Sequence, residues 1–155
     1  MNQKEVSRQL YRQVMMDHAR APHHLHPLKK RANTFFAKKI NQSCGDAYGV
    51  EVEIEKGRIR RLAFDGDGCA ISMAASSMLF DQVQGKTIEE AESIIRRYFD
   101  AVVAVGCKQK PDVTGLGELE MIIHVGHYPS RVKCATLTGH ALSDALAKAR
   151  MDQSV

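Results

Sequence analysis

The chain has 155 residues, 44% of them hydrophobic, and a formal net charge of +4 at pH 7, which excludes a disordered chain and suits a single domain over residues 1–155. The positive charge is spread out, with no arginine-rich run and no tryptophan, so nucleic-acid binding is not expected. No apolar stretch is long enough for a membrane span, and the polar N-terminus does not look like a signal peptide, so we expect a cytoplasmic protein.

The first third of the chain predicts a helix, a loop and a strand. Residues 4–20 form a helical pattern, with Val6, Leu10 and Val14 on one face. Two prolines follow, and the HHLH segment at residues 23–26 is expected to be a solvated loop rather than a set of metal ligands. Residues 34–40 predict a short first strand.

Residues 50–64 predict a β-hairpin. Valine or isoleucine alternates with glutamate up to residue 55, and a second strand returns after a Lys56-Gly57 turn. A two-residue turn places Glu53 opposite Arg60, which is a favourable pair of opposite charges. The same register places Val52 opposite Arg61, and that pair fits poorly.

Two cysteines lie at equal distances from this turn. Cys44 precedes it and Cys69 follows it, both beyond the open end of the hairpin. Because the paired strands bring their outer ends together, the register predicts that the two thiols lie near each other, although not necessarily in contact.

The second half of the chain predicts helices. A segment rich in small residues follows Cys69 and stops at Gly85, and a capping-box pattern at Thr87 opens the next helix. Residues 107–117 are expected to be a loop and residues 118–125 another helix, and Cys134 is expected to start the last helix. The fold class is therefore α+β, with helices packed against a small antiparallel sheet.

The cysteines are the residues that point to chemistry. The chain has four cysteines and no CxxC pair, so in a reducing compartment they are buried apolar residues, metal ligands or catalytic thiols. Helix N-termini are expected to favour the thiolates of Cys69 and Cys134, and Arg131 and Lys133 add positive charge near the second.

Cys44 and Asp46 flank Gly45 in a turn, so both side chains can bend toward one centre. With Cys69 and Cys134 they make a donor set of three sulfurs and a carboxylate, which suits tetrahedral zinc and would also accept ferrous iron or an iron–sulfur cluster. The competing interpretation is that each cysteine is a small buried side chain and that Asp46 only shapes the turn.

Two further residues have a structural interpretation beside a functional one. Cys107 lies in a polar segment and is interpreted as an exposed bystander thiol. His140 lies well inside the last predicted helix, where a hydrogen-bonded structural histidine is at least as good an interpretation as a functional one.

Three segments carry a resemblance to a known family: the SCGD turn, GDGCAISMAASSM and YPSRVKCATLTGHAL, supported by LYRQVMMDHARAPHH near the N-terminus. Together they resemble the SufU branch of the IscU/NifU iron–sulfur cluster assembly superfamily. Lys133 stands where the IscU branch has histidine, and the interval between Cys69 and Cys134 is longer than in IscU. Both differences favour SufU.

The resemblance implies a SufE/NifU-like fold of three strands and about five or six helices. It implies zinc held by Cys44, Asp46, Cys69 and Cys134, and a sulfurtransferase in which Cys44 accepts persulfide sulfur. The implied partners are a SufS-like cysteine desulfurase dependent on pyridoxal phosphate, which supplies the sulfur, and the SUF scaffold complex downstream. The alternatives are an assembly scaffold carrying a transient iron–sulfur cluster, and a zinc-stabilised regulator of a desulfurase.

Overall fold

The computed structural model describes residues 2–152 and has a three-stranded antiparallel sheet of order β1-β2-β3 packed against helices. The predicted α+β class is confirmed. The strands are β1 (Thr34–Asn41), β2 (Asp46–Glu55) and β3 (Arg58–Asp67). The helices are α1 (Gln3–Arg20), α2 (Ala70–Val83), α3 (Ile88–Gly106) and α4 (Pro129–Met151), with two short 3₁₀ helices, η1 (Gly117–Met121) and η2 (Ile123–His127).

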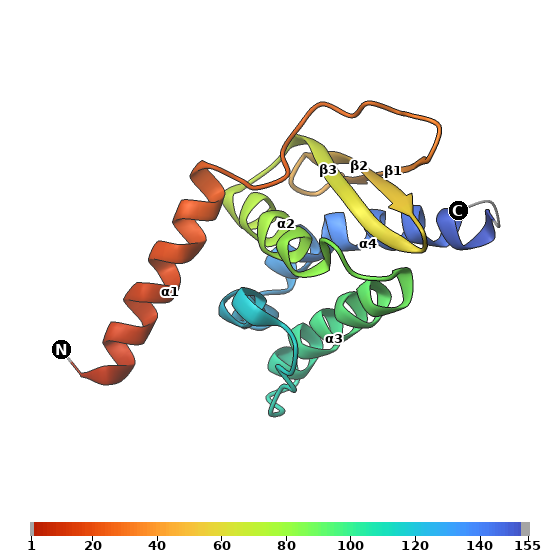
Figure 1. Cartoon of the computed structure of the whole chain (residues 1–155). Coiled ribbons are helices and arrows are strands. Elements are labelled where there is room, and N and C mark those ends of the chain that lie inside the picture. Colours follow the sequence, from red (N-terminus) through yellow and green to blue (C-terminus); the bar gives the residue numbers. More distant parts are fainter. Residues whose placement is uncertain (1, 153–155) are drawn as a thin grey trace.

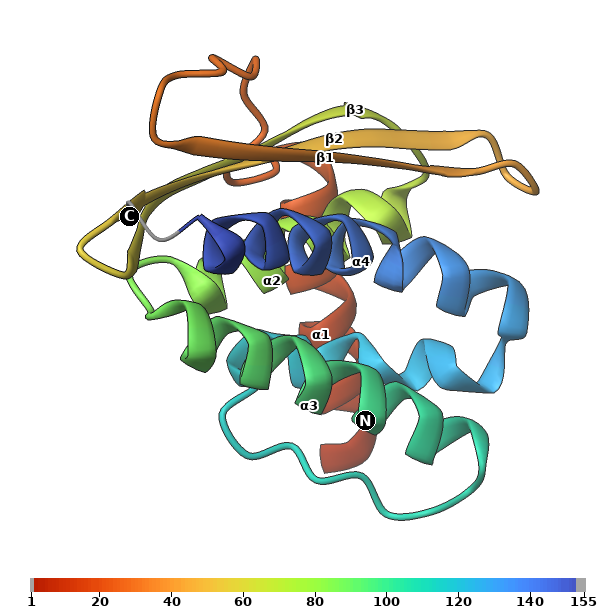
Figure 2. The same cartoon turned by 90° about the vertical axis from the view of Figure 1, so that its right-hand side faces the viewer.

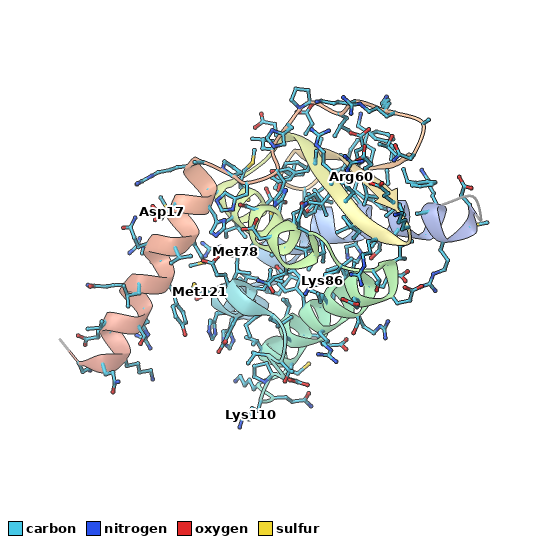
Figure 3. All side chains as sticks on the ribbon, viewed as in Figure 1. Asp17, Arg60, Met78, Lys86, Lys110 and Met121 are labelled. Carbon is cyan, nitrogen blue, oxygen red and sulfur yellow. The ribbon has the colours of Figure 1, made fainter. Side chains whose placement is uncertain are left out.

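The elements stack in layers beneath the sheet (Figures 1 and 2). α2 and α4 lie directly under it, and α3 with the 3₁₀ helices forms the next layer. Val50, Val52 and Ile54, which alternate along β2, are at most 2% exposed and belong to the hydrophobic core that the sheet shares with these helices. Side chains fill the space between the layers (Figure 3). The alternating pattern of the sequence therefore marks the face of β2 that packs on the helices.

The β2–β3 hairpin contains a one-residue irregularity that the sequence did not reveal. The predicted register holds next to the turn and then shifts, so that Glu53 pairs with Arg61 and not with Arg60. Arg60 is the extra residue, yet its Nε still lies 3.6 Å from the Glu53 carboxylate. The shift places Val52 opposite Leu62, which removes the poor match in the predicted register.

The outer face of β2 is covered by the segment between α1 and β1. Glu51 points to this side and is only 4% exposed. Its carboxylate accepts hydrogen bonds from the backbone N–H groups of Lys29, at 2.9 Å, and of Lys30. A buried carboxylate needs such donors, so Glu51 fixes this segment across the sheet (Figure 1).

α1 projects from the rest of the molecule and meets α2 at its C-terminal end (Figure 1). The predicted apolar face of this helix is only partly covered. Val14 packs against the core, whereas Val6 and Leu10 are 42% and 60% exposed. His18, in the last turn of α1, is buried.

Two helix predictions in the last third of the chain were wrong. The helix expected over residues 118–125 is the pair of 3₁₀ helices η1 and η2. The last helix begins at Pro129 and not at Cys134, because proline is well suited to the first position of a helix, where no N–H is needed. Among the described residues, no helix combines the length and apolar character that crossing a bilayer requires.

Candidate metal centre

Cys44 lies in the β1–β2 turn, at the end of the sheet opposite the β2–β3 turn. Gly45 adopts φ +76°, a conformation that favours glycine, and its N–H donates to the Asn41 carbonyl at 2.9 Å. The turn leaves the Cys44 side chain exposed and places Asp46, the first residue of β2, only 1% exposed beside it.

Cys69 is the N-cap of α2, as the sequence predicted. Its Sγ accepts from the N–H of Ser72 at 3.5 Å, in the geometry of a capping side chain. Its own backbone N–H donates to Asp46 Oδ1 at 3.1 Å, and its Sγ lies 3.8 Å from Asp46 Oδ2. Asp46 therefore ties the start of β2 to the start of α2.

Cys134 reaches the same place from α4, but not from the helix N-terminus. It lies in the second turn, five residues after Pro129, so the expected stabilisation of its thiolate by the helix end is absent. The thiol is 7% exposed, and burial, followed by the neighbouring Cys44 and Cys69, raises its pKa well above the usual range. Burial therefore favours the protonated form of this thiol.

The donor atoms of Cys44, Asp46 and Cys134 all lie within 4.8 Å of one another. Cys44 Sγ is 3.3 Å from Cys134 Sγ, whereas two thiolates on tetrahedral zinc lie about 3.8 Å apart. The two sulfurs would therefore have to move slightly apart to bind one zinc ion together. Cys69 lies next to this group of three, with its Sγ 3.8 Å from Asp46 Oδ2. The donor set fits zinc chemically, and the four ligand roles remain predictions.

Asn41 is a member of this site that sequence reasoning missed. Its Nδ2 lies 2.8 Å from Cys44 Sγ and 4.0 Å from Cys134 Sγ, and its Oδ1 accepts from the Ser43 N–H at 3.2 Å. The Ser43 contact fixes the amide so that its NH₂ group faces the two sulfurs. The only signal in the sequence was an asparagine three residues before Cys44.

We expect Asn41→Leu to weaken zinc binding by about tenfold or more, because a thiolate loses a hydrogen-bond donor. Asn41→Asp keeps the acceptor for Ser43 but replaces the donor with a negatively charged oxygen beside the sulfurs, so it reports on charge as well as on the lost hydrogen bond. Competition with a chromophoric chelator measures both affinities. An Asn41→Leu protein that binds zinc as tightly as the wild type would show that the Asn41 amide does not support the thiolates.

Of the two basic residues expected near Cys134, Arg131 packs on a ring and Lys133 is exposed. The Arg131 guanidinium lies over the ring of Tyr128, 5.0 Å from its centroid, and lines an apolar groove between α1, α2 and η2. Lys133 is exposed on α4. These positions do not show the predicted stabilisation of the thiolates by Arg131 and Lys133.

Cys107 and His140 also lie apart from the thiols. Cys107 is the exposed C-cap residue of α3. His140 stacks on Phe99, with ring centroids 4.5 Å apart, and burial lowers its pKa. The exposed position of Cys107 is consistent with a bystander thiol, and the ring contact gives His140 a packing role on Phe99.

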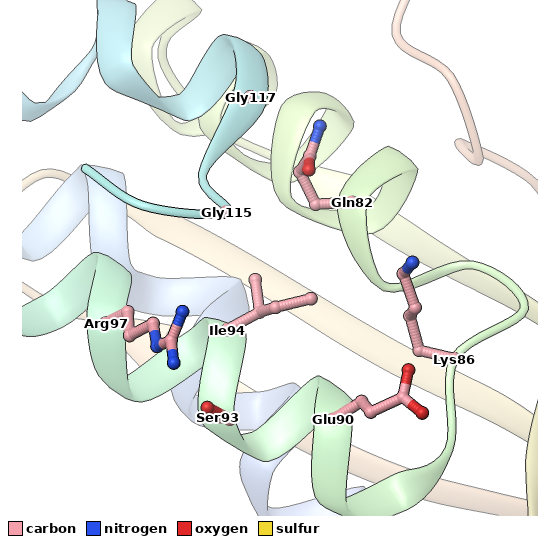
Figure 4. Close-up of a pocket in the computed structure, with 8 residues that line it drawn as sticks. All are labelled: Gln82, Lys86, Glu90, Ser93, Ile94, Arg97, Gly115 and Gly117. Carbon is pink, nitrogen blue, oxygen red and sulfur yellow. The ribbon is translucent and has the colours of Figure 1, made fainter.

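A hollow of about 490 Å³ lies between α2, α3 and the segment before η1 (Figure 4). Gln82 on α2 and Ile94 and Arg97 on α3 line it, together with two glycines of the intervening segment. Its residues do not include the cysteines, and its walls are a mixture of polar and apolar surface. It therefore offers no thiol and no soft metal ligand.

Comparison with known proteins finds matches over most of the chain. A family model described as NifU-like N terminal domain matches residues 10–135. The iron–sulfur cluster assembly scaffold protein IscU of Streptococcus pyogenes serotype M1 is 35% identical over 139 residues, covering 90% of this chain and 84% of that protein. The zinc-dependent sulfurtransferase SufU of Bacillus subtilis (strain 168) is 34% identical over 139 residues, covering 90% of each.

The fold also matches solved structures. One is a protein from Fervidobacterium islandicum AW-1 described as an iron–sulfur cluster assembly scaffold for the SUF system. It superposes with a TM-score of 0.74 at 27% identity, covering 90% of this chain and 98% of that one. A NifU-like N-terminal domain from Brucella abortus, at 20% identity and a TM-score of 0.75, shares the fold.

Proposed function

The chain belongs to the family of NifU-like N-terminal domains, the iron–sulfur cluster assembly family that includes IscU and SufU, and on that premise we propose that it is a zinc-dependent sulfurtransferase. It takes sulfur from the persulfide of a cysteine desulfurase and delivers it to iron–sulfur cluster assembly, with the SUF scaffold complex as the receiver. The observation that carries the proposal is the convergence of an exposed thiol, a buried thiol and a buried carboxylate at one end of the sheet.

Four residues would hold the zinc: Cys44, Asp46, Cys69 and Cys134. Zinc bound there would keep the thiols deprotonated at neutral pH, including Cys134, whose pKa burial raises. Asp46 would hold the β2 and α2 ends together through its bond to the Cys69 N–H. The name of the Bacillus subtilis relative supports zinc as the ion.

Cys44 is the thiol best placed to receive sulfur. It is exposed and lies in a turn beside Gly45, where even an added Cβ would meet no atom within 4 Å. Cys69 is also exposed but caps α2, and Cys134 on α4 is buried, so moving either would disturb a packed helix. The Cys44 side chain can therefore swing toward a partner at the least cost in packing.

The transfer is a thiol–persulfide exchange. The Cys44 thiolate attacks the outer sulfur of the desulfurase persulfide, a new S–S bond forms, and the donor S–S bond breaks to release the desulfurase thiolate. The proton on the outer sulfur travels with it. The Asn41 NH₂ group, 2.8 Å from Cys44 Sγ, stabilises the attacking thiolate before the transfer.

The second candidate is an assembly scaffold, which the name of the Streptococcus pyogenes relative favours. The same sulfurs accept iron. Iron retained through purification, with a coloured protein after loading with iron and sulfide, would favour the scaffold. A colourless zinc protein that takes up persulfide sulfur would favour the sulfurtransferase.

The direct test is to map the transferred sulfur. The zinc-loaded protein is incubated with a cysteine desulfurase and cysteine, thiols are blocked by alkylation, and peptides are analysed by mass spectrometry. We expect one added sulfur on Cys44, because it is exposed and lies in a turn, whereas the exposed Cys69 caps α2. Sulfur on Cys69, Cys107 or Cys134 with Cys44 unmodified would contradict the assignment.

A further inference from the structure

A second group of ligand-type side chains lies away from the thiols, at the junction of α1 and α2. It consists of His18 in the last turn of α1, His23 in the following loop and Asp81 near the end of α2. One ligand atom from each lies within 4.8 Å of the others. The sequence suggested only a solvated histidine loop, so the convergence with α2 is a finding of the fold.

The loop is held to α2 by polar contacts that involve its histidines. His23 Nδ1 lies 2.7 Å from Asp81 Oδ2, and His24 Nε2 lies 2.8 Å from Asp81 Oδ1. The backbone N–H of His23 also donates to Ser77 Oγ at 2.8 Å. These contacts hold the His23 ring beside Asp81 and close to His18, whose ring centroid is 4.8 Å away.

The buried histidine has a polar partner at each ring nitrogen. His18 is 6% exposed, with Nδ1 2.6 Å from Ser77 Oγ and Nε2 3.3 Å from Glu118 Oε1. Whichever nitrogen binds an ion, the other keeps a partner that fixes the ring. His24 likewise orients Asp81, because its Nε2 lies 2.8 Å from Oδ1 of that carboxylate. Ligands of metal sites are oriented by outer contacts of this kind.

We propose that His18, His23 and Asp81 form a second metal site, which binds a divalent transition metal independently of the thiols. Two imidazole nitrogens and a carboxylate oxygen suit Zn²⁺, Ni²⁺ or Cu²⁺ and not a cation that requires only oxygen ligands. Bonds of about 2.0–2.2 Å bring such donors to about 3.4 Å apart. The exposed His23 lies on a loop and can make this movement.

The site joins the projecting helix to the body of the molecule. α1 meets α2 near its C-terminal end, and its N-terminal half carries the exposed Val6 and Leu10 (Figures 1 and 2). An ion shared by His18 on α1 and Asp81 on α2 cross-links the two helices. Metal occupancy therefore sets how firmly α1 is held.

The test counts ions and separates the two sites. Metal-free protein is equilibrated with Zn²⁺ and dialysed, and zinc is measured per chain. We expect two ions in the wild type and one in His23→Ala or Asp81→Asn, with the affinity for the second ion at least about tenfold lower. His26→Ala is the matched control, since this exposed histidine of the same loop lies outside the group.

Cobalt shows which site is lost. The thiol site gives sulfur-to-cobalt charge-transfer absorption, which His23→Ala must retain, while the absorption from the nitrogen and oxygen site disappears. Hydrogen exchange at the end of α1 is expected to slow on zinc addition in the wild type and not in His23→Ala. A zinc content per chain that is the same in the wild type, His23→Ala and Asp81→Asn overturns the proposal, whether or not the thiol site is filled.

Discussion

Replacing Cys69 by serine is expected to lower zinc at the thiol site from one ion per chain to a small fraction of that. The melting temperature at saturating zinc is expected to fall by about 10 °C. A ligand present at a thousand times its Kd stabilises the folded state by about 4 kcal/mol, and each kcal/mol shifts the melting temperature of a chain of this size by roughly 2–4 °C. Zinc analysis and thermal unfolding measure the two effects.

Serine is chosen because Cys69 has two roles. Its Sγ caps α2 by accepting from the Ser72 N–H, and serine is itself a preferred N-cap residue. The substitution therefore removes the soft ligand and keeps the cap, whereas Cys69→Ala removes both. With a chelator present, Cys69→Ser and the wild type should melt within a few degrees of each other. Their free energies of unfolding should then differ by about 1 kcal/mol or less.

Cys107→Ser is the control for the loss of a thiol, because Cys107 is exposed on α3 and lies apart from the site. It should bind zinc and melt as the wild type does. Full zinc occupancy of the thiol site in Cys69→Ser would remove Cys69 from the ligand set, and loss of zinc in Cys107→Ser would add Cys107 to it.

In an assay with a thiol reductant, which reduces the transferred persulfide to sulfide, replacing Cys44 by histidine is expected to lower the sulfide release that this protein adds to that of the desulfurase alone by at least about 100-fold, because the covalent acceptor is lost. Histidine is itself a zinc ligand, so this variant keeps a donor at the position while it cannot carry a persulfide. Cys44→Ala, which has neither property, shows how much of the effect comes from the metal. Sulfide released per minute and zinc content are measured on the same samples.

The exposure of Cys44 and the burial of Cys134 predict different outcomes for the two thiols. Cys134→Ser should lose zinc, and any remaining sulfur should still appear on Cys44. A Cys44→His protein that binds zinc and releases sulfide at the wild-type rate would refute the acceptor role. It would leave the family membership unaffected.

Most of the sheet and its link to the thiols could be predicted from the sequence, because both depend on local patterns. Alternation in β2 marked the buried face, and the equal spacing of Cys44 and Cys69 from the turn predicted that the thiols lie at one end of the hairpin. The irregularity at Arg60 was missed, since a one-residue shift changes no composition. The poor match of Val52 with Arg61 was its only trace.

The features that the sequence did not reveal depend on contacts between distant segments. The His18 group owes its role to Asp81 in α2, and Asn41 adds a longer contact with Cys134 in α4 to its local contacts in the turn. No local pattern encodes these contacts with distant helices. The position of Cys134 was misjudged because Pro129 was interpreted as a break, although proline is equally at home in the first turn of a helix. The family resemblance compensated for this, since it depends on the motif and not on the helix boundary.

The contact between Cys44 and Cys134 spans 90 residues of sequence, and this separation orders events during synthesis. At about 5–20 residues per second, the turn that carries Cys44 precedes Cys134 by roughly 5 to 20 s. α4 then packs on β1 and β2 and brings in the last sulfur. In a nascent chain the early thiols lack this partner, so the contact between Cys44 and Cys134 forms only when the final helix docks.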